Sequence, residues 1–263
     1  NTGSDGVSIG NVGTPEGAIS SSTTDYATLN NLAGVAGSTF ITIGEQVTNY
    51  PTGTFVGFDI QNLGIVSISI LDNITITTYR DGVLKQAKTG SGNLLVGANA
   101  LVGGRQIVGF VSDSAVDKVK LSLNQTLSLN IGTTRVYSAV FESFCAGPAL
   151  GCNTQQAITS PAYPLLVAGN HTGITGFLCA LCGINDAGNV IDNNVTNYAT
   201  INLGVDVTTV GRLSVKDQIT DYPANTFVGF HIENSVLVGA NLFSGITLRT
   251  YRNGVLKQTK TGA

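Results

Sequence analysis

Charged side chains are scarce in this chain of 263 residues. Asp, Glu, Lys and Arg together make up 11% of it, against roughly 25% in an average soluble domain. The 13 basic residues are scattered and the net charge is −3, whereas nucleic-acid binding needs clustered Lys and Arg. No apolar run reaches the roughly 18 residues of a membrane-spanning helix. We therefore expect no nucleic-acid partner and no membrane span.

The sequence also contains no Trp, no Met and only two His. The lack of Trp removes the aromatic anchor on which glycan-binding modules usually depend. His171 and His231 have no Ser in a nucleophile-elbow pattern to act on, and no phosphate-cradling loop is present. In the internal repeat described below, His231 aligns with Asp59. Because the position accepts either Asp or His, we expect a solvent-facing strand residue there rather than a catalytic base. We expect that the protein is not an enzyme and that it requires no cofactor.

The chain does contain a long internal repeat. Residues 23–91 align without a gap on 195–263, so that Tyr26, Tyr50 and Tyr79 each lie 172 residues before an equivalent Tyr. More than two fifths of the aligned residues are identical. A fixed period of this size indicates tandem domains rather than solenoid repeats. The second copy has no counterpart of residues 92–144, and we expect the chain to be a window cut from a longer array.

Short alternating segments indicate strands, and helical periodicity is nearly absent. In Ile74–Tyr79 and Lys118–Leu123 apolar and polar residues alternate, as in a sheet with one buried face. The density of such segments predicts an all-β fold of tandem antiparallel β-sandwiches, jelly-roll-like, with the second incomplete. The further strand candidates are Thr39–Ile43, Thr54–Ile60, Ile65–Leu71, Val83–Lys88, Gln106–Val111, Thr133–Phe141, Tyr163–Ala168 and Thr226–Ile232.

Two turns can be predicted in both copies. Asp81-Gly82 and Asn253-Gly254 separate two strand candidates, and these dipeptides supply the positive φ angles of a type I′ hairpin turn. The segments after Tyr50 and Tyr222 place Pro early in a turn, followed by Gly53 in one copy and Asn225 in the other. Both residue types tolerate a positive φ.

The repeat, together with the Pro and Cys residues between its copies, divides the chain into three parts. They are a first sandwich at 1–144, a linker at 145–172 with three Pro, and a truncated second sandwich at 173–263. Disulfides are the interpretation we favour for the cysteines in and after the linker, which would indicate an oxidising compartment, although the pairing stays open. A zinc site is the alternative, although the first two cysteines are spaced too widely for a usual zinc knuckle. Redox catalysis by the last two cysteines is also possible in principle, but the sequence around them lacks the βαβ pattern of thioredoxin-like proteins. The four candidates are Cys145, Cys152, Cys179 and Cys182.

The segment Gly188–Thr200 resembles the lead-in to the first core strand of discoidin-type, galactose-binding-like jelly rolls. Val108–Val111 and Val116–Leu121 look like the closing strands of related carbohydrate-binding sandwiches. In such families the lead-in often binds a structural calcium ion. The resemblance implies a calcium site here from the oxygen-bearing side chains Asp192, Asn193, Asn194 and Asn197. An ordinary Asx turn leading into a strand is the alternative.

A glycan would need an aromatic platform with polar side chains beside it. Tyr79 with Arg80, and Tyr251 with Arg252, stand next to the predicted hairpin turn in both copies. They are the candidates for a small stacking surface. The alternative is a Tyr packed across the strand pair with a solvated Arg beside it.

The blocks Tyr-Pro-x-x-Thr-Phe-Val-Gly-Phe and Thr-Tyr-Arg-(Asp/Asn)-Gly-Val-Leu-Lys-Gln occur in both copies. With the Thr-, Val- and Gly-rich sandwiches and the Cys-containing linker, they resemble the large repetitive cell-surface adhesins of Bacteroidetes, including those that gliding species export by type IX secretion. The resemblance implies an extracellular, cell-surface location and a role in attachment or as a filament.

Two functions stay open. In the first, the units are a structural stalk whose partners are neighbouring repeats. In the second, each unit binds a surface glycan with the help of calcium. An incomplete sandwich would also expose apolar strands, which a longer parent chain or a neighbouring chain would have to cover.

Overall fold

The structure is a computed structural model that describes residues 2–6, 10–31, 37–63, 68–98, 104–125, 132–176, 182–203, 209–234 and 245–262. The chain is all-β, as the alternation predicts. It divides into two compact units, residues 1–219 and 220–263. The helical segments described are four short 3₁₀ turns: η1 (Pro15–Ile19), η2 (Ile68–Asn73), η3 (Gly169–His171) and η4 (Ala187–Val190).

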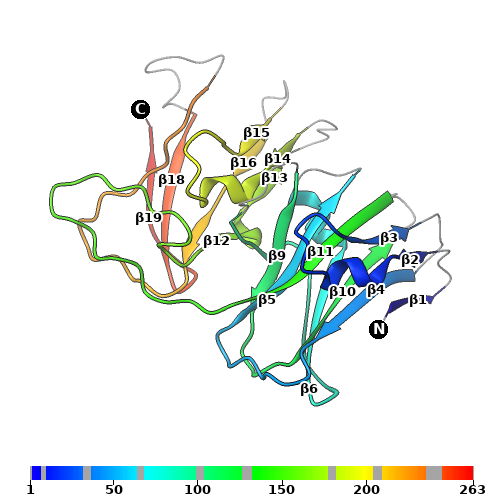
Figure 1. Cartoon of the computed structure of the whole chain (residues 1–263). Coiled ribbons are helices and arrows are strands. Elements are labelled where there is room, and N and C mark those ends of the chain that lie inside the picture. The colour runs from blue at the N-terminus through cyan, green and yellow to red at the C-terminus, as the bar shows by residue number, and fades with distance from the viewer. Residues whose placement is uncertain are drawn as a thin grey trace. The chain divides into compact units, whose positions relative to one another are not determined.

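The first unit contains a five-stranded antiparallel sheet (Figure 1). Its strand order is β1-β4-β10-β6-β7, so that the central strand β10 comes from far along the chain. Ile41 on β4, Leu121 on β10 and Ile76 on β6 stand opposite one another across three strands. The strands are β1 (Thr2–Gly6), β4 (Gly37–Gly44), β10 (Lys118–Gln125), β6 (Ile74–Arg80) and β7 (Val83–Thr89).

An eight-stranded sheet forms the other layer, in the order β17-β12-β8-β9-β5-β11-β3-β2. The sheet takes in β12 from the predicted linker and β17 from the second copy. The division at 1–144, 145–172 and 173–263 follows the repeat and stays a prediction. The strands are β17 (Val215–Asp217), β12 (Leu165–Ala168), β8 (Leu95–Val96), β9 (Gln106–Val111), β5 (Phe55–Asn62), β11 (Gly132–Glu142), β3 (Ala27–Asn31) and β2 (Asn11–Gly13).

The inward side chains of the two sheets form one hydrophobic core. On β10, Val119, Leu121 and Leu123 are fully buried and Lys120 is half-buried, while Ser122 is also buried. The alternation of that segment therefore predicts its core-facing residues correctly, because successive residues of a strand point to opposite faces. This arrangement confirms the predicted sandwich, and the jelly-roll subtype stays a prediction.

Strands β5 and β9 approach closely at a pair of glycines. Gly57 stands opposite Gly109. A Cβ at Gly57 would meet the Val108 carbonyl oxygen at 2.2 Å, and one at Gly109 would meet the Val56 carbonyl oxygen at 2.3 Å. The ring of Phe55 lies over Gly109, 2.6 Å from where that Cβ would stand. Larger residues would force the two strands apart.

The lead-in of the second copy folds like that of the first. Strand β14 (Gly183–Asn185) pairs with β15 (Thr200–Asn202), and β2 pairs with β3 in the equivalent register. The 3₁₀ turn that follows each short strand begins after a left-handed residue, Thr14 in one copy and Asp186 in the other. A further pair of short strands joins β13 (Gly173–Thr175) to β16 (Val210–Arg212).

The second unit contains the hairpin of β18 (Thr247–Arg252) and β19 (Val255–Thr261). It repeats the β6–β7 hairpin, including a register irregularity just before the Tyr. Asp81 and Gly82 have φ angles of 52° and 76°, and Asn253 and Gly254 have 51° and 75°. The predicted positive φ values are confirmed, as they are at Gly53 (89°) and Asn225 (69°).

Two strand predictions are wrong. Within Ile65–Leu71, residues 65–67 lie outside the described residues and the remainder is the turn η2. Residues 66–70 alternate between apolar and polar as a strand would, but Ile68 and Ile70 are buried within the turn η2. Alternation over so few residues could not decide between a strand and a turn packed on the core. Thr226–Ile232, the counterpart of β5, is not a strand.

The strand predicted at Thr226–Ile232 does not form because this segment lacks the neighbouring strands that β5 has. In unit 1, β5 lies between β9 and β11, and the chain has no counterpart of those two strands for copy two. Phe227 is 86% exposed and Ile232 is 47% exposed, whereas Phe55 and Ile60 are 0% and 1% exposed. A strand needs a hydrogen-bonding partner beside it, and strand propensity alone does not supply one.

Candidate functional site

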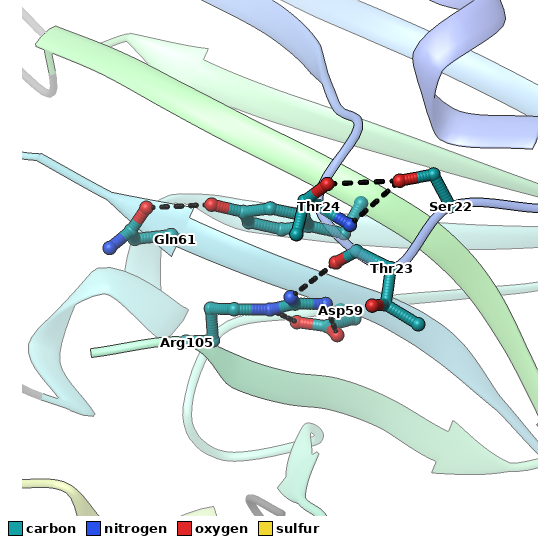
Figure 2. A network of polar contacts seen from close by, with 7 residues as sticks. Ser22, Thr23, Thr24, Asp59, Gln61 and Arg105 are labelled. Carbon is teal, nitrogen blue, oxygen red and sulfur yellow. Dashed lines mark hydrogen bonds and ion pairs between the residues drawn. The ribbon is translucent and has the colours of Figure 1, made fainter. Parts of the chain in front are cut away.

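The most elaborate polar site in the described residues lies on the outer face of the eight-stranded sheet. Asp59 on β5 points away from the core, and Arg105, just before β9, lies beside it. The Arg105 Nε donates to Asp59 Oδ1 at 3.1 Å and its Nη2 donates to Asp59 Oδ2. The Arg105 Nη1 also donates to the Thr23 carbonyl oxygen at 2.8 Å, as Figure 2 shows. The ion pair is buried, with side chains about 10% exposed.

Tyrosines and a second arginine surround this pair. The Arg105 guanidinium carbon lies 3.6 Å from the ring centre of Tyr137. The Tyr137 hydroxyl donates to Gln61 Oε1 at 2.9 Å, and Arg135 Nη1 donates to the same oxygen at 3.2 Å. Arg135 stacks on Tyr26, whose ring meets that of Tyr137 edge to face. We call this set the arginine–tyrosine cluster: Tyr26, Asp59, Gln61, Arg105, Arg135 and Tyr137.

Burial raises the pKa of the Asp59 carboxyl above its ordinary value of 3.8, because desolvation outweighs the opposing hydrogen bond and charge of Arg105. Both carboxylate oxygens accept hydrogen bonds from the guanidinium. A catalytic base must reach a substrate proton, and this buried carboxylate is turned toward Arg105 instead. Through its hydrogen bonds and ring contacts, the cluster connects the segment before β3 with β5, β9 and β11.

The prediction that the Asp59 position faces solvent is therefore wrong for copy one. For copy two the predicted exposure is right, since His231 is exposed, but the predicted strand is not formed there. The sequence carries a signal for the pair that we missed. The carboxylate is replaced in the copy that has no counterpart of residues 92–144, and Arg105 lies within those residues.

The residues predicted to bind calcium lie in one loop, where they bond to each other. Asp192 is buried, and its two carboxylate oxygens accept from the Asn194 backbone N–H at 3.0 Å and from Asn197 Nδ2 at 2.8 Å. Asn194 Oδ1 accepts from the backbone N–H and hydroxyl of Thr196. Asn193 is exposed. The loop is thus two successive Asx turns, the alternative that the sequence also offered.

Copy one makes the same bonds with different residues. Ser20 and Asp25 stand where Asp192 and Asn197 stand, and the Ser20 hydroxyl donates to Asp25 Oδ2 at 2.7 Å. Ser22 accepts from the backbone N–H of Thr24, as Asn194 does from that of Thr196. Donor and acceptor have exchanged places between the copies while the connection is kept. The equivalence identifies the loop as a structural part of the repeat.

The glycan candidates lie at the two hairpins, with Tyr79 and Arg80 on β6 and Tyr251 and Arg252 on β18. Tyr79 is half-buried, and Arg80 Nε lies 3.6 Å from Asp81 Oδ2. Tyr251 is 39% exposed, and Arg252 pairs with Asp221 through its Nη2 at 2.9 Å. A role of these four residues in glycan binding stays a prediction.

Two of the predicted disulfide candidates, Cys145 and Cys152, are free and exposed. The cysteines predicted one or two bridges, and a bridge that involves Cys145 or Cys152 is not formed in this structure. Cys145 lies in irregular structure and Cys152 in a turn, and their closeness in sequence does not make them a pair. Cys179 lies outside the described residues, so a bridge between it and Cys182 stays a prediction.

Other sites are sparse in the part of the chain that the structure describes. There, no group of three or more His, Cys, Asp or Glu side chains is placed to hold a metal ion. The hollow bordered by Ile60, Asn62, Ile70, Gly104 and Gln106 has no room for a water molecule. No described helix is long and apolar enough to cross a membrane. Comparisons with family models, curated proteins and solved structures give no match for this chain.

Proposed function

We propose that the chain is a stretch of extracellular structural repeats from a cell-surface adhesin or filament. Its partners are neighbouring repeats, and it has no catalytic role. The low charge and the Thr- and Ser-rich faces support an extracellular setting, and the resemblance to Bacteroidetes adhesins supports export by type IX secretion.

One observation carries this proposal. Between the copies, the features that determine the backbone are kept: the lead-in bonds, the left-handed residues and the hairpin register. Asp59 and Gln61 of the arginine–tyrosine cluster are not kept, since they become His231 and Glu233, although Tyr79 and Arg80 are kept as Tyr251 and Arg252. A repeated catalytic or binding module would be expected to keep its chemistry and vary its turns.

A glycan array tests the proposal. The whole chain would be applied with calcium and again with a chelator, and we expect no glycan to be retained above background in either condition. Retention of a defined glycan would contradict a purely structural role. An antibody against residues 1–219 should label intact cells of the source organism without permeabilisation.

Calcium-assisted glycan binding is the second candidate, and one observation favours it. Asn197 Oδ1 is buried without a hydrogen-bond partner, in the loop that holds Asp192. Amide and carboxylate oxygens are suitable calcium ligands. Titration calorimetry with calcium alone separates the two: the structural proposal predicts no heat of binding, and Asp192→Ala would abolish any heat that is seen.

A further inference from the structure

Five apolar side chains of the second unit are exposed although their counterparts in copy one are buried. Val228, Phe230 and Ile232 correspond to core-facing side chains of β5, and Leu248 corresponds to Ile76 on β6. Phe227 corresponds to Phe55, which is buried on the other face of β5. The counterparts are at most 1% exposed. We call these five residues the open set.

Exposure here does not reflect residue type, because the two hairpins provide an internal control. Val255 and Leu256 are 56% and 50% exposed, and their counterparts Val83 and Leu84 are 58% and 57% exposed. The tip of the hairpin is therefore exposed in both copies. The difference is confined to residues that other strands cover in copy one.

The covering strands in copy one are known. β5 lies between β9 and β11, and β6 lies between β7 and β10. In copy two the β7 counterpart is present as β19. The other three covering strands, β9, β10 and β11, follow one another in sequence within residues 104–142. Their inward side chains are buried apolar residues: Val108, Phe110, Val119, Leu121, Leu123 and Val136.

We propose that the open set binds a polypeptide segment with the strand pattern of residues 104–142. The segment supplies one strand on each side of the β5 counterpart and one beside β18. The main-chain bonds of such added strands give affinity, and the alternating apolar residues give register. A second copy of this chain is a poorer occupant, because its own β9, β10 and β11 are already held in two sheets.

A graft onto the full chain tests the proposal. Residues 92–144 would be joined directly after Ala263, which is the counterpart of Ser91. Amide hydrogen exchange of residues 227–232 should slow on the order of 100-fold relative to the ungrafted chain. Residues 55–60, in unit 1, report in the same sample whether the protein is folded. Unchanged exchange at 227–232 with protected residues 55–60 would overturn the proposal.

A matched control carries Val119→Asn, Leu121→Asn and Leu123→Asn in the grafted segment alone. It has the same length and leaves unit 1 intact, and we expect exchange at 227–232 to stay as fast as in the ungrafted chain. Equal protection by this control would overturn the proposal, since the apolar pattern would then be irrelevant. So would protection of 227–232 in the ungrafted chain on dimerisation, measured by exchange and sedimentation across concentration.

Discussion

Copy one and copy two place nearly the same side chains in opposite environments. Phe58 is fully buried in the sandwich, whereas Phe230 is 46% exposed. The sequences around both are Phe-Val-Gly-Phe, so local propensity is the same. The difference teaches that burial of these residues is set by β9, β10 and β11 rather than by the segments that contain them.

The hairpins teach the complementary point. β6–β7 and β18–β19 have the same pairing, the same turn angles and equivalent Thr–Thr contacts, at 2.8 Å and 3.1 Å. A hairpin makes its hydrogen bonds within itself, so its pairing can be the same in both copies although their surroundings differ. The predictions below test where the copies differ and where they agree.

The largest effect is expected at the paired phenylalanines. Phe58→Ala should lower the free energy of unfolding of unit 1 by about 3–5 kcal/mol, because it leaves a cavity in the core. Phe230→Ala should change stability by less than about 0.5 kcal/mol, as exposed positions do. Urea denaturation followed by circular dichroism measures both. Similar losses in the two variants would contradict the comparison.

The buried ion pair comes next. Arg105→Gln leaves the Asp59 carboxylate buried without its cation, and it should cost about 3 kcal/mol at neutral pH. His231→Asp introduces the copy-one residue at an exposed position that lacks the arginine, and should cost less than about 0.5 kcal/mol. Arg80→Gln is the control for loss of an exposed arginine.

The Arg105→Gln variant should also respond to pH. The folded pKa of Asp59 is raised, so this group's contribution to stability is greatest below pH 3.8 and falls as pH rises through the folded pKa. Loss of Arg105 raises that pKa further. The deficit of the variant should therefore shrink on acidification, as denaturation at pH 7 and at pH 3.5 would show. A deficit that grows at low pH would reject this account of Asp59.

A smaller effect is expected in the lead-in loop of copy two. Asp192→Ala removes two hydrogen bonds and should cost about 1–2 kcal/mol. The double variant Asp192→Ser with Asn197→Asp reproduces the copy-one pair and should recover most of that loss. Thermal unfolding of unit 1 measures both. No recovery would mean that the two loops are not equivalent.

The smallest effect is expected at the turn glycines, where the copies should agree. Gly82 and Gly254 have positive φ angles of 76° and 75°, so Gly82→Ala and Gly254→Ala should each cost about 1 kcal/mol in hairpin stability. Exchange of the amides of β7 and β19 reports the two hairpins separately. A clear difference between the copies would show that the hairpin is not an independent element.

The parts of the fold that the sequence predicted are the local ones. Asp81-Gly82 and Asn253-Gly254 determine their turns within two residues, and the alternation of β10 determines its buried face. The pairing of Asp59 with Arg105 joins residues 46 apart, and no local pattern reports it. For Phe227, propensity predicted a strand that only absent neighbours could complete. The candidate site was missed for the same reason, since its six residues come from four segments.

The most direct test of the account compares amide hydrogen exchange in residues 55–60 with that in 227–232 of the same intact chain. The two segments share most of their sequence, so their intrinsic exchange rates are nearly equal. The account predicts strong protection of residues 55–60 and near-intrinsic exchange of residues 227–232. Equal protection of the two segments would contradict the claim that β9, β10 and β11 decide their burial.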